Sequence, residues 1–366
     1  MALSIEDVTS ALSSVMDPEL RAPITTLDMV GDISVSDSSL AVEIRLTIVG
    51  CPAADTIERD VRQALSGVAG ERSVELTVGV MTTDQRTSLI TRLRKGKSPT
   101  NPFTPDSLTR VIAVTSGKGG VGKSSITVNL AAAVSRQGFS VGIIDADVFG
   151  FSIPGLLGIP SLQPTQIDDM MLPPVAHDIK VLSIGMFLGS EQAVAWRGPL
   201  LHRTLEQFLT DSYFGDLDFL FLDLPPGTGD IAISVGQLLP HAEILVVTTP
   251  QPSASDVAWR SGDVARQTGQ TVLGVIENMS GVTLADGTRL DVFGSGGGQA
   301  VAERLKVPLL GSLPLSQSLR EAGDRGVPLV ISEPGNAVSN QLHDIASAIV
   351  QGGKSKVGVK LPVSLV

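Results

Sequence analysis

The chain has 366 residues, 42% hydrophobic and 18% charged, a length and composition that suit two or three domains with buried cores and not a disordered chain. Its net charge of −11 argues against a surface that binds DNA, RNA or anionic lipid, because these ligands need clustered lysine and arginine. The single cysteine, Cys51, excludes a disulfide framework and any site with four cysteine ligands from one chain.

The amino-terminal sequence lacks the basic and apolar regions of a signal or transit peptide. The apolar runs of the chain break well before the roughly 18 residues that are needed to span a bilayer. We therefore expect a soluble cytoplasmic protein, with neither nucleic acid nor a membrane among its partners.

The first part of the chain predicts a small α/β domain. Ser4 and Asp7 form a capping-box pattern, and the apolar residues that follow recur at helical spacing. Apolar and polar residues alternate over 42–48 and 74–78, which is the period of half-buried strands. Between these strands, Pro52 stands at the start of a second predicted helix.

A linker follows this domain, because the sequence KGKSPTNPFTP at 95–105 has three prolines, two lysines and little apolar content. We therefore expect four segments, namely a small α/β domain at 1–95, a linker at 96–108, a second domain at 109–350 and a carboxyl-terminal tail at 351–366.

The second domain contains short apolar runs that alternate with helix-like sequence. The runs are VIAVTS, VGIID, FLFLDL, ILVVTT and VLGVIEN. Continuous apolar strands are typical of parallel sheets that are buried on both faces. We therefore expect an α/β fold with a mostly parallel sheet, covered by helices on both faces and preceded by the small α/β domain.

A phosphate-binding loop is predicted between the first of these strands and the helix that follows. The sequence GKGGVGKS at 117–124 satisfies the pattern G-x-x-x-x-G-K-[ST]. Its glycines let successive N–H groups point at phosphate oxygens, and the next helix adds its positive end. We expect Lys123 to reach the β- and γ-phosphates and Ser124 to coordinate Mg²⁺. A glycine-rich turn without a ligand is the alternative.

Carboxylates stand at the ends of two of the predicted strands. Asp223 ends FLFLDL, and Asp145 and Asp147 end VGIID. A carboxylate at the carboxyl edge of a parallel sheet can hold the Mg²⁺ shell. A strand-end aspartate can also be no more than a helix cap.

Several motifs together carry a family resemblance. The segment SGKGGVGKSS resembles the deviant Walker A motif of the MinD, ParA and nitrogenase iron-protein ATPases. The segments DADVFGFSIPGLLG, WRGPL, DFLFLDLPPGTGD, IENMS and REAGDRGVPLV resemble the Mrp/ApbC iron–sulfur cluster carrier family in order and spacing. Asp17-Pro18-Glu19-Leu20 and Gly50-Cys51-Pro52 resemble the PaaD-like domain that often precedes such ATPases.

The resemblance implies a role for particular residues. Lys118 matches the lysine that reaches the partner subunit's nucleotide across a dimer, and Asp147 matches the switch I aspartate that positions the attacking water. Asp223 matches the Walker B aspartate, and Asn278 the adenine-binding asparagine. The implied catalytic residues are Lys118, Lys123, Asp147 and Asp223, and the implied Mg²⁺ ligands are Ser124, Asp147 and Asp223. The implied nucleotide-binding residues are Gly117, Lys118, Gly119, Gly120, Val121, Gly122, Lys123, Ser124, Ser125 and Asn278.

The chain departs from this family just after Asn278. Many Mrp-type carriers have a Cys-x-x-Cys there, by which two subunits share one [4Fe–4S] cluster, but residues 280–294 contain no cysteine. Their alternating apolar residues on both sides of a turn at 285–287 predict a hairpin instead.

Cys51 then remains as the only sulfur ligand. It precedes a predicted helix, whose amino-terminal dipole would lower the pKa of the thiol and favour the thiolate. A dimer would supply two such thiolates to iron or a cluster. The alternative, which we favour, is that Cys51 packs as a small apolar residue.

The resemblance as a whole implies a homodimeric, slow ATPase that carries or assembles iron–sulfur clusters and delivers them to apoproteins. Its implied cofactors are ATP, Mg²⁺ and, where a ligand set exists, a [4Fe–4S] cluster. One alternative is a partitioning or positioning ATPase of the ParA/MinD kind, which needs a basic DNA surface or an amphipathic membrane helix. Another is an ATP-dependent scaffold that holds no cluster.

Overall fold

The computed structural model describes residues 3–96, 98–148, 150–187, 198–284 and 286–352. The chain forms two compact units. The first consists of Met1–Thr100, Gln163–Val175 and Thr210–Gly215, and the second of Asn101–Leu162, Ala176–Leu209 and Asp216–Val366. Of the expected tail at 351–366, residues 353–366 lie outside the described residues.

The first unit is built on a three-stranded sheet in the order β3-β4-β5, in which β4 is antiparallel to β3 and parallel to β5. Every second residue of β4 is buried, as the alternating sequence predicts. The first helix begins with a capping box, in which the Ser4 hydroxyl accepts a hydrogen bond from the Asp7 N–H at 3.1 Å. The elements are α1 (Ile5–Leu12), β1 (Met16–Asp17), β2 (Ala22–Pro23), β3 (Val30–Val35), β4 (Ser39–Leu46), α2 (Ala54–Ala69), β5 (Ser73–Val80) and α3 (Thr83–Leu93).

A hairpin from the later sequence also belongs to the first unit, so the division expected from the sequence is incomplete. This hairpin consists of β8 (Thr165–Ile167) and β9 (Met170–Leu172), and its apolar side chains lie in the hydrophobic core of the unit. Thr165 donates a hydrogen bond to buried Glu19 at 2.6 Å. Arg86 and Arg94 form ion pairs with Asp168 and Asp169 at 3.1 and 2.7 Å.

The second unit contains an eight-stranded sheet in the order β10-β11-β7-β12-β6-β13-β14-β17. The strand pairs from β11 to β17 are parallel, which confirms the predicted fold class. The strands are β6 (Arg110–Ser116), β7 (Val141–Asp145), β10 (Val175–Ala176), β11 (Ile179–Ser183), β12 (Phe219–Asp223), β13 (Glu243–Thr248), β14 (Thr271–Glu277) and β17 (Leu309–Ser312).

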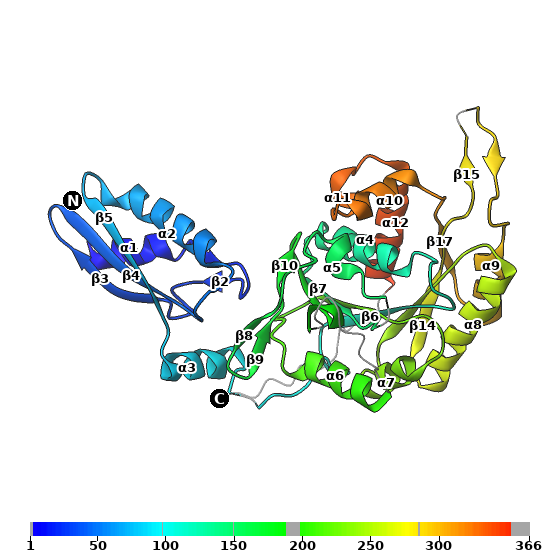
Figure 1. Cartoon of the computed structure of the whole chain (residues 1–366), viewed down its shortest axis with the longest axis horizontal. Coiled ribbons are helices and arrows are strands. Elements are labelled where there is room, and N and C mark those ends of the chain that lie inside the picture. Colours follow the sequence, from blue (N-terminus) through cyan, green and yellow to red (C-terminus); the bar gives the residue numbers. More distant parts are fainter. Residues whose placement is uncertain (1–2, 97, 149, 188–197, 285, 353–366) are drawn as a thin grey trace. The chain divides into compact units, whose positions relative to one another are not determined.

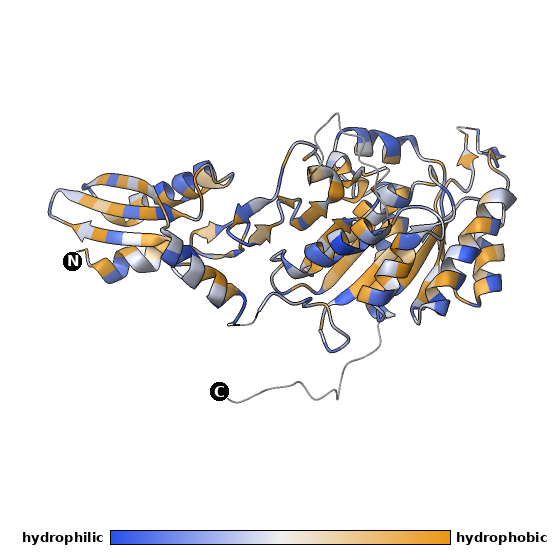
Figure 2. Ribbon diagram, turned by 60° about the horizontal axis from the view of Figure 1, so that its bottom comes forward, coloured by the Kyte–Doolittle hydropathy of each residue, from blue (hydrophilic) through white to orange (hydrophobic). Residues whose placement is uncertain are grey.

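Helices cover both faces of this sheet (Figure 1). Figure 2 shows its apolar strands between helices that carry hydrophilic residues on their outer faces. One group of helices is α4 (Lys123–Ser135), α5 (Ile153–Leu156), α10 (Gln317–Asp324), α11 (Leu329–Ser332) and α12 (Ala337–Gln351). The other contains α6 (Gly198–Thr210), α7 (Asp230–Leu238), α8 (Pro252–Gln267) and α9 (Gly297–Leu305), and the 3₁₀ helix η1 (Ile184–Phe187) follows β11.

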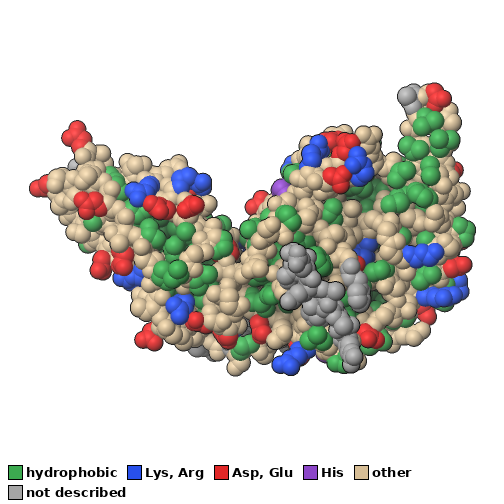
Figure 3. Space-filling model, in the orientation of Figure 1, with side chains coloured by type: hydrophobic (Ala, Val, Ile, Leu, Met, Phe, Trp, Pro, Cys, Tyr) green, Lys and Arg blue, Asp and Glu red, His purple; other side chains and the backbone are tan. Residues whose placement is uncertain are grey.

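The hairpin predicted in place of the cysteine pair is present in a short form. Its strands β15 (Val282–Thr283) and β16 (Arg289–Leu290) are antiparallel, and Ala285 of the expected turn lies outside the described residues. Hydrophobic side chains lie along this hairpin at the surface (Figure 3). Leu284, Leu290 and Val292 are 42, 45 and 55% exposed, so they do not pack in the core.

Candidate functional site

The site lies at the carboxyl edge of the large sheet, where polar residues end neighbouring strands. Asp145 at the end of β7 is directly opposite Asp223 at the end of β12. β6 pairs with the other side of β12 and leads into the glycine-rich loop, which ends where α4 begins at Lys123. Parallel pairing therefore brings together the loop, Asp145 and Asp223, although Asp223 lies 100 residues after Lys123 in the sequence.

Glycine is required in the loop for two reasons, namely its backbone conformation and close packing. Gly120 and Gly122 have φ of 80 and 83°, in the left-handed region that glycine adopts without strain. Gly117 is needed for close packing, because a Cβ there would lie 2.3 Å from the backbone nitrogen of Ala258 in α8. Helix α8 and the loop backbone are thus in direct contact.

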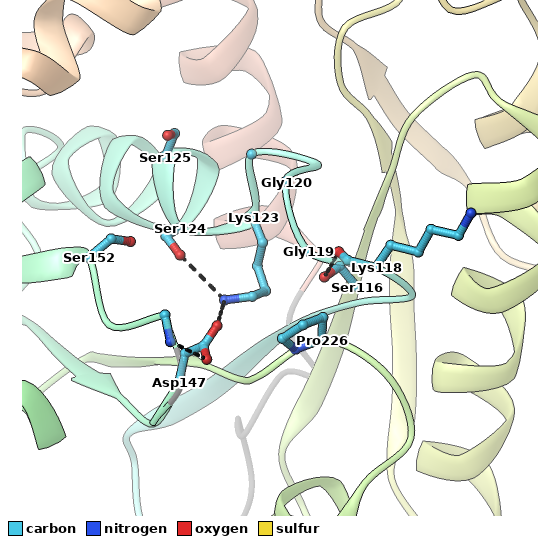
Figure 4. A pocket seen from close by; sticks show the side chains of 12 residues that line it. Ser116, Lys118, Gly119, Gly120, Lys123, Ser124, Ser125, Asp147, Ser152 and Pro226 are labelled. Atoms are coloured by element: carbon cyan, nitrogen blue, oxygen red, sulfur yellow. Dashed lines mark hydrogen bonds and ion pairs between the residues drawn. The ribbon is translucent and has the colours of Figure 1, made fainter. Parts of the chain in front are cut away.

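A cavity of about 410 Å³ opens beside this loop (Figure 4). It is lined by Ser116, Lys118, Gly119, Gly120, Gly122, Lys123, Ser124, Ser125, Asp147, Gly150, Ser152 and Pro226. Most of the loop residues expected to bind nucleotide line this one cavity, together with Asp147 from the loop after β7. Gly117 and Val121 are not among the lining residues. Ser116, Gly150, Ser152 and Pro226 line it as well, although no motif identified them in the sequence.

The ammonium of Lys123 lies among the site's carboxylates. Its Nζ is 2.6 Å from Asp223 Oδ2 and 3.6 Å from Asp147 Oδ2 (Figure 4 shows the second pair). Asp223 is fully buried and also accepts hydrogen bonds from the hydroxyls of Ser124 at 2.6 Å and Thr127 at 2.8 Å. A buried carboxylate of this kind is stable only with such partners. Thr127 was missed in the sequence because it lies beyond the loop motif.

Asp145 fixes the backbone of the loop after β7 by hydrogen bonds. Its Oδ1 accepts the Asp147 N–H at 3.2 Å, and its Oδ2 accepts the Ser183 hydroxyl at 3.0 Å and the Ile153 N–H at 3.3 Å. Burial, and then the neighbouring Asp223, raise the pKa of Asp145 well above its usual range. We expected Asp145, like Asp147 and Asp223, at the carboxyl edge of the sheet, and its two oxygens there accept hydrogen bonds from Asp147, Ile153 and Ser183.

Lys118 and Asn278 are placed differently from the other expected residues. The Lys118 side chain points away from Lys123 and Asp147, although the residue lines the cavity (Figure 4). Asn278 is buried, and its side-chain amide donates a hydrogen bond to the Val121 carbonyl at 2.9 Å. Asn278 thus supports the loop from outside the cavity lining, and its role in binding adenine remains a prediction.

Of the two readings of Cys51, the structure agrees with the favoured one, in which it packs as a small apolar residue, and not with a thiolate. Cys51 is 5% exposed and lies in the hydrophobic core of the first unit, while α2 begins only at Ala54. Burial, and then the charges of Glu19 and Asp17, raise the pKa of the thiol to about 11. The environment therefore favours the neutral thiol, in agreement with packing as a small apolar residue. Within the described residues, no three His, Cys, Asp or Glu side chains are grouped so as to hold a metal ion.

No helix among the described residues is long and apolar enough to cross a membrane.

Trp196 and Arg197 of the WRGPL segment lie outside the described residues.

Two family models match the chain. Residues 107–350 match a family described as NUBPL iron-transfer P-loop NTPase, and residues 5–78 match one described as iron-sulfur cluster assembly protein. A Mycobacterium bovis protein named iron-sulfur cluster carrier protein is 53% identical over 363 residues, which are 97% of this chain and 95% of that protein.

Solved structures resemble the second unit. A nucleotide-binding protein from Archaeoglobus fulgidus, in complex with ADP, is 34% identical with a TM-score of 0.53, and the match covers 61% of this chain and 92% of that one. The cell division ATPase MinD of Pyrococcus furiosus has a TM-score of 0.51 at 22% identity and covers 67% of this chain and 99% of that one, which shows the shared fold.

Proposed function

The chain belongs to the NUBPL iron-transfer P-loop NTPase family, and we propose that it is an ATP-hydrolysing iron–sulfur cluster carrier or assembly factor that delivers clusters to apoproteins. The observation that carries the proposal is the cavity of the glycine-rich loop, whose Lys123 forms ion pairs with Asp147 and Asp223, in a chain whose relatives of nearly equal length are named as cluster carriers. The net charge of −11 does not favour the basic DNA surface that the ParA-like alternative needs.

The cavity suits the phosphates of MgATP. The backbone of Gly119, Gly120 and Gly122 lines it, and helix α4 begins directly after the loop, so N–H groups and the helix dipole can face an anion. The oxygens of Ser124, Asp147 and Asp223 are ligands of the kind that Mg²⁺ prefers. We propose that Lys123 exchanges the carboxylates for phosphate oxygens when nucleotide binds.

Hydrolysis requires mainly positioning and charge neutralisation. Asp147 is suitably placed to orient water, because its backbone is fixed by Asp145 and its side chain accepts the Gly150 N–H at 3.1 Å. Lys118 points away from Lys123 in the same chain. We therefore propose that it acts on the nucleotide of a second copy in a homodimer.

In this proposal the iron–sulfur cluster is what the protein delivers, and the chain has few residues that could bind it. The chain has one cysteine, which is buried and neutral, and no Cys-x-x-Cys after Asn278. A cluster held by thiolates of this chain does not fit these residues. This observation favours an assembly or delivery factor whose cluster takes its thiolates from outside the chain, such as the receiving apoprotein or a small thiol.

Hydrolysis is tested by phosphate release. We expect slow release of phosphate that needs Mg²⁺ and falls roughly 100-fold in Asp147→Asn, because the variant loses the carboxylate that orients water. The matched control is Asp324→Asn in α10, an exposed aspartate outside the cavity lining, which should keep the wild-type rate. A wild-type protein that binds MgATP without releasing phosphate would refute the hydrolytic part of the proposal.

A further inference from the structure

The turn that follows β11 touches the loop between β7 and α5, which carries Asp147. Ser183 ends β11 directly opposite Asp145 in the parallel ladder, and it is fully buried. Its hydroxyl donates a hydrogen bond to Asp145 Oδ2 at 3.0 Å and accepts one from the Gly185 N–H at 3.2 Å. Because the hydroxyl has one proton, the bond from Gly185 directs that proton toward Asp145.

Asp145 in turn forms hydrogen bonds with the backbone at both ends of the loop between β7 and α5. Its two oxygens accept the N–H of Asp147, where the loop begins, and of Ile153, where α5 begins. Within the same loop, Gly150 and Ser152 line the nucleotide cavity. One carboxylate therefore fixes a segment that forms part of the cavity wall, and Ser183 fixes that carboxylate.

A second contact joins the loop to the same turn. A Cβ on Gly185 would lie 2.2 Å from the ring of Phe151, so this ring packs directly against the backbone of the turn. Phe151 is 44% exposed, and its solvent-facing ring is thus held on one side by Gly185. Any larger residue at position 185 must displace the loop.

We propose that Ser183 and Gly185 form a seat that fixes the β7–α5 loop in the geometry needed for hydrolysis. Ser183 is a positioning residue, which acts on Asp147 through Asp145, and it does not touch the nucleotide. The inference rests on the proposed ATPase function. It assigns a role to a residue that lies outside every sequence motif and outside the cavity lining.

The test is the steady-state rate and the MgATP affinity of Ser183→Ala. We expect kcat to fall about tenfold or more, because small displacements of a reacting group lower rates steeply. The Kd for MgATP should stay within about twofold of the wild-type value, since the loop of residues 117–124, which includes Lys123, is unchanged. Ser183→Thr keeps the hydroxyl and should recover most of kcat. Gly185→Ala, which displaces Phe151, should lower kcat in the same way.

Ser339→Ala is the matched control, since Ser339 is equally buried and its hydroxyl donates to the Leu329 and Glu333 carbonyls in the region of α11 and α12. Both serine variants should lose a few degrees of melting temperature, but only Ser183→Ala should lose kcat. Equal kcat in Ser183→Ala and wild type, or an equal loss in both serine variants, would overturn the inference. A wild type without phosphate release would instead refute the proposed function.

Discussion

Replacing Lys123 with alanine should abolish most of the thermal stabilisation that MgATP gives the wild-type protein. A ligand at a hundredfold excess over its Kd stabilises the folded state by about 2.7 kcal/mol. For a unit of this size, that free energy raises the melting temperature by roughly 5–10 °C. Since Lys123 supplies the buried cation of the cavity, its loss should reduce this rise to about 1 °C. The measurement is a melting curve with and without MgATP.

The same variant should show a pH dependence in the absence of nucleotide. Lys123 is the cation that opposes the raised pKa of Asp145, so its removal should raise this pKa further. A carboxyl whose native pKa is raised stabilises the fold below its unfolded pKa of about 4, and this contribution is lost as pH rises through the native pKa. The melting temperature of Lys123→Ala should therefore fall more steeply than that of wild type between pH 5 and 8.

The matched control is Arg320→Ala in α10, which removes an exposed cation whose ion pairs contribute little to stability. It should keep both the stabilisation by MgATP and the pH profile of wild type. A full MgATP-induced rise in Lys123→Ala would mean that the nucleotide binds elsewhere.

Replacing Lys118 with alanine should leave MgATP binding within about threefold of wild type and lower turnover by more than 100-fold. A cation supplied in trans to a transferring phosphoryl group contributes roughly 10³–10⁵ to the rate. The Lys118 side chain points away from Lys123 in its own chain, so it is not required for binding there (Figure 4). Equilibrium binding and phosphate release on the same preparation separate the two effects.

Mixing two inactive variants tests whether Lys118 acts across a dimer. In a heterodimer of Lys118→Ala with Asp147→Asn, one composite site has an intact Asp147 in its own chain and an intact Lys118 from the other. Random exchange makes half the dimers mixed, each with one intact site of two, so about a quarter of wild-type activity should return. A mixture that remains inactive, although the chains exchange, would show that Lys118 acts within its own chain.

The sequence was sufficient to predict the fold class and most of the cavity, because both depend on local patterns. Continuous apolar runs identified the strands of the parallel sheet, and a contiguous motif identified the loop around Lys123. Parallel pairing then requires that Asp145 and Asp223 meet at one edge. The features that could be predicted are therefore those that depend only on residues close together in the sequence or at the ends of paired strands.

Contacts between distant parts of the sequence could not be predicted in this way. The hairpin of β8 and β9 joins the first unit, through pairs such as Thr165 with Glu19, although nothing in its own sequence indicates this partner. Cys51 lies before a helix, but its pKa is governed by burial and by Glu19 and Asp17, which come from an earlier segment. Ser183 was missed because it ends a strand without a motif, and only the register shows it opposite Asp145.

In the proposed function, the ATPase cycle serves the delivery of iron–sulfur clusters. This role is tested most directly by incubating the protein without oxygen with iron, sulfide and a small thiol, removing unbound iron, and adding an apoprotein that needs a [4Fe–4S] cluster. Activation of the apoprotein should be faster with MgATP than without it. Lys123→Ala should lose this acceleration, whereas Cys51→Ser should keep it. If the treated protein retains no iron, and MgATP does not change the activation of the apoprotein, the claim is contradicted.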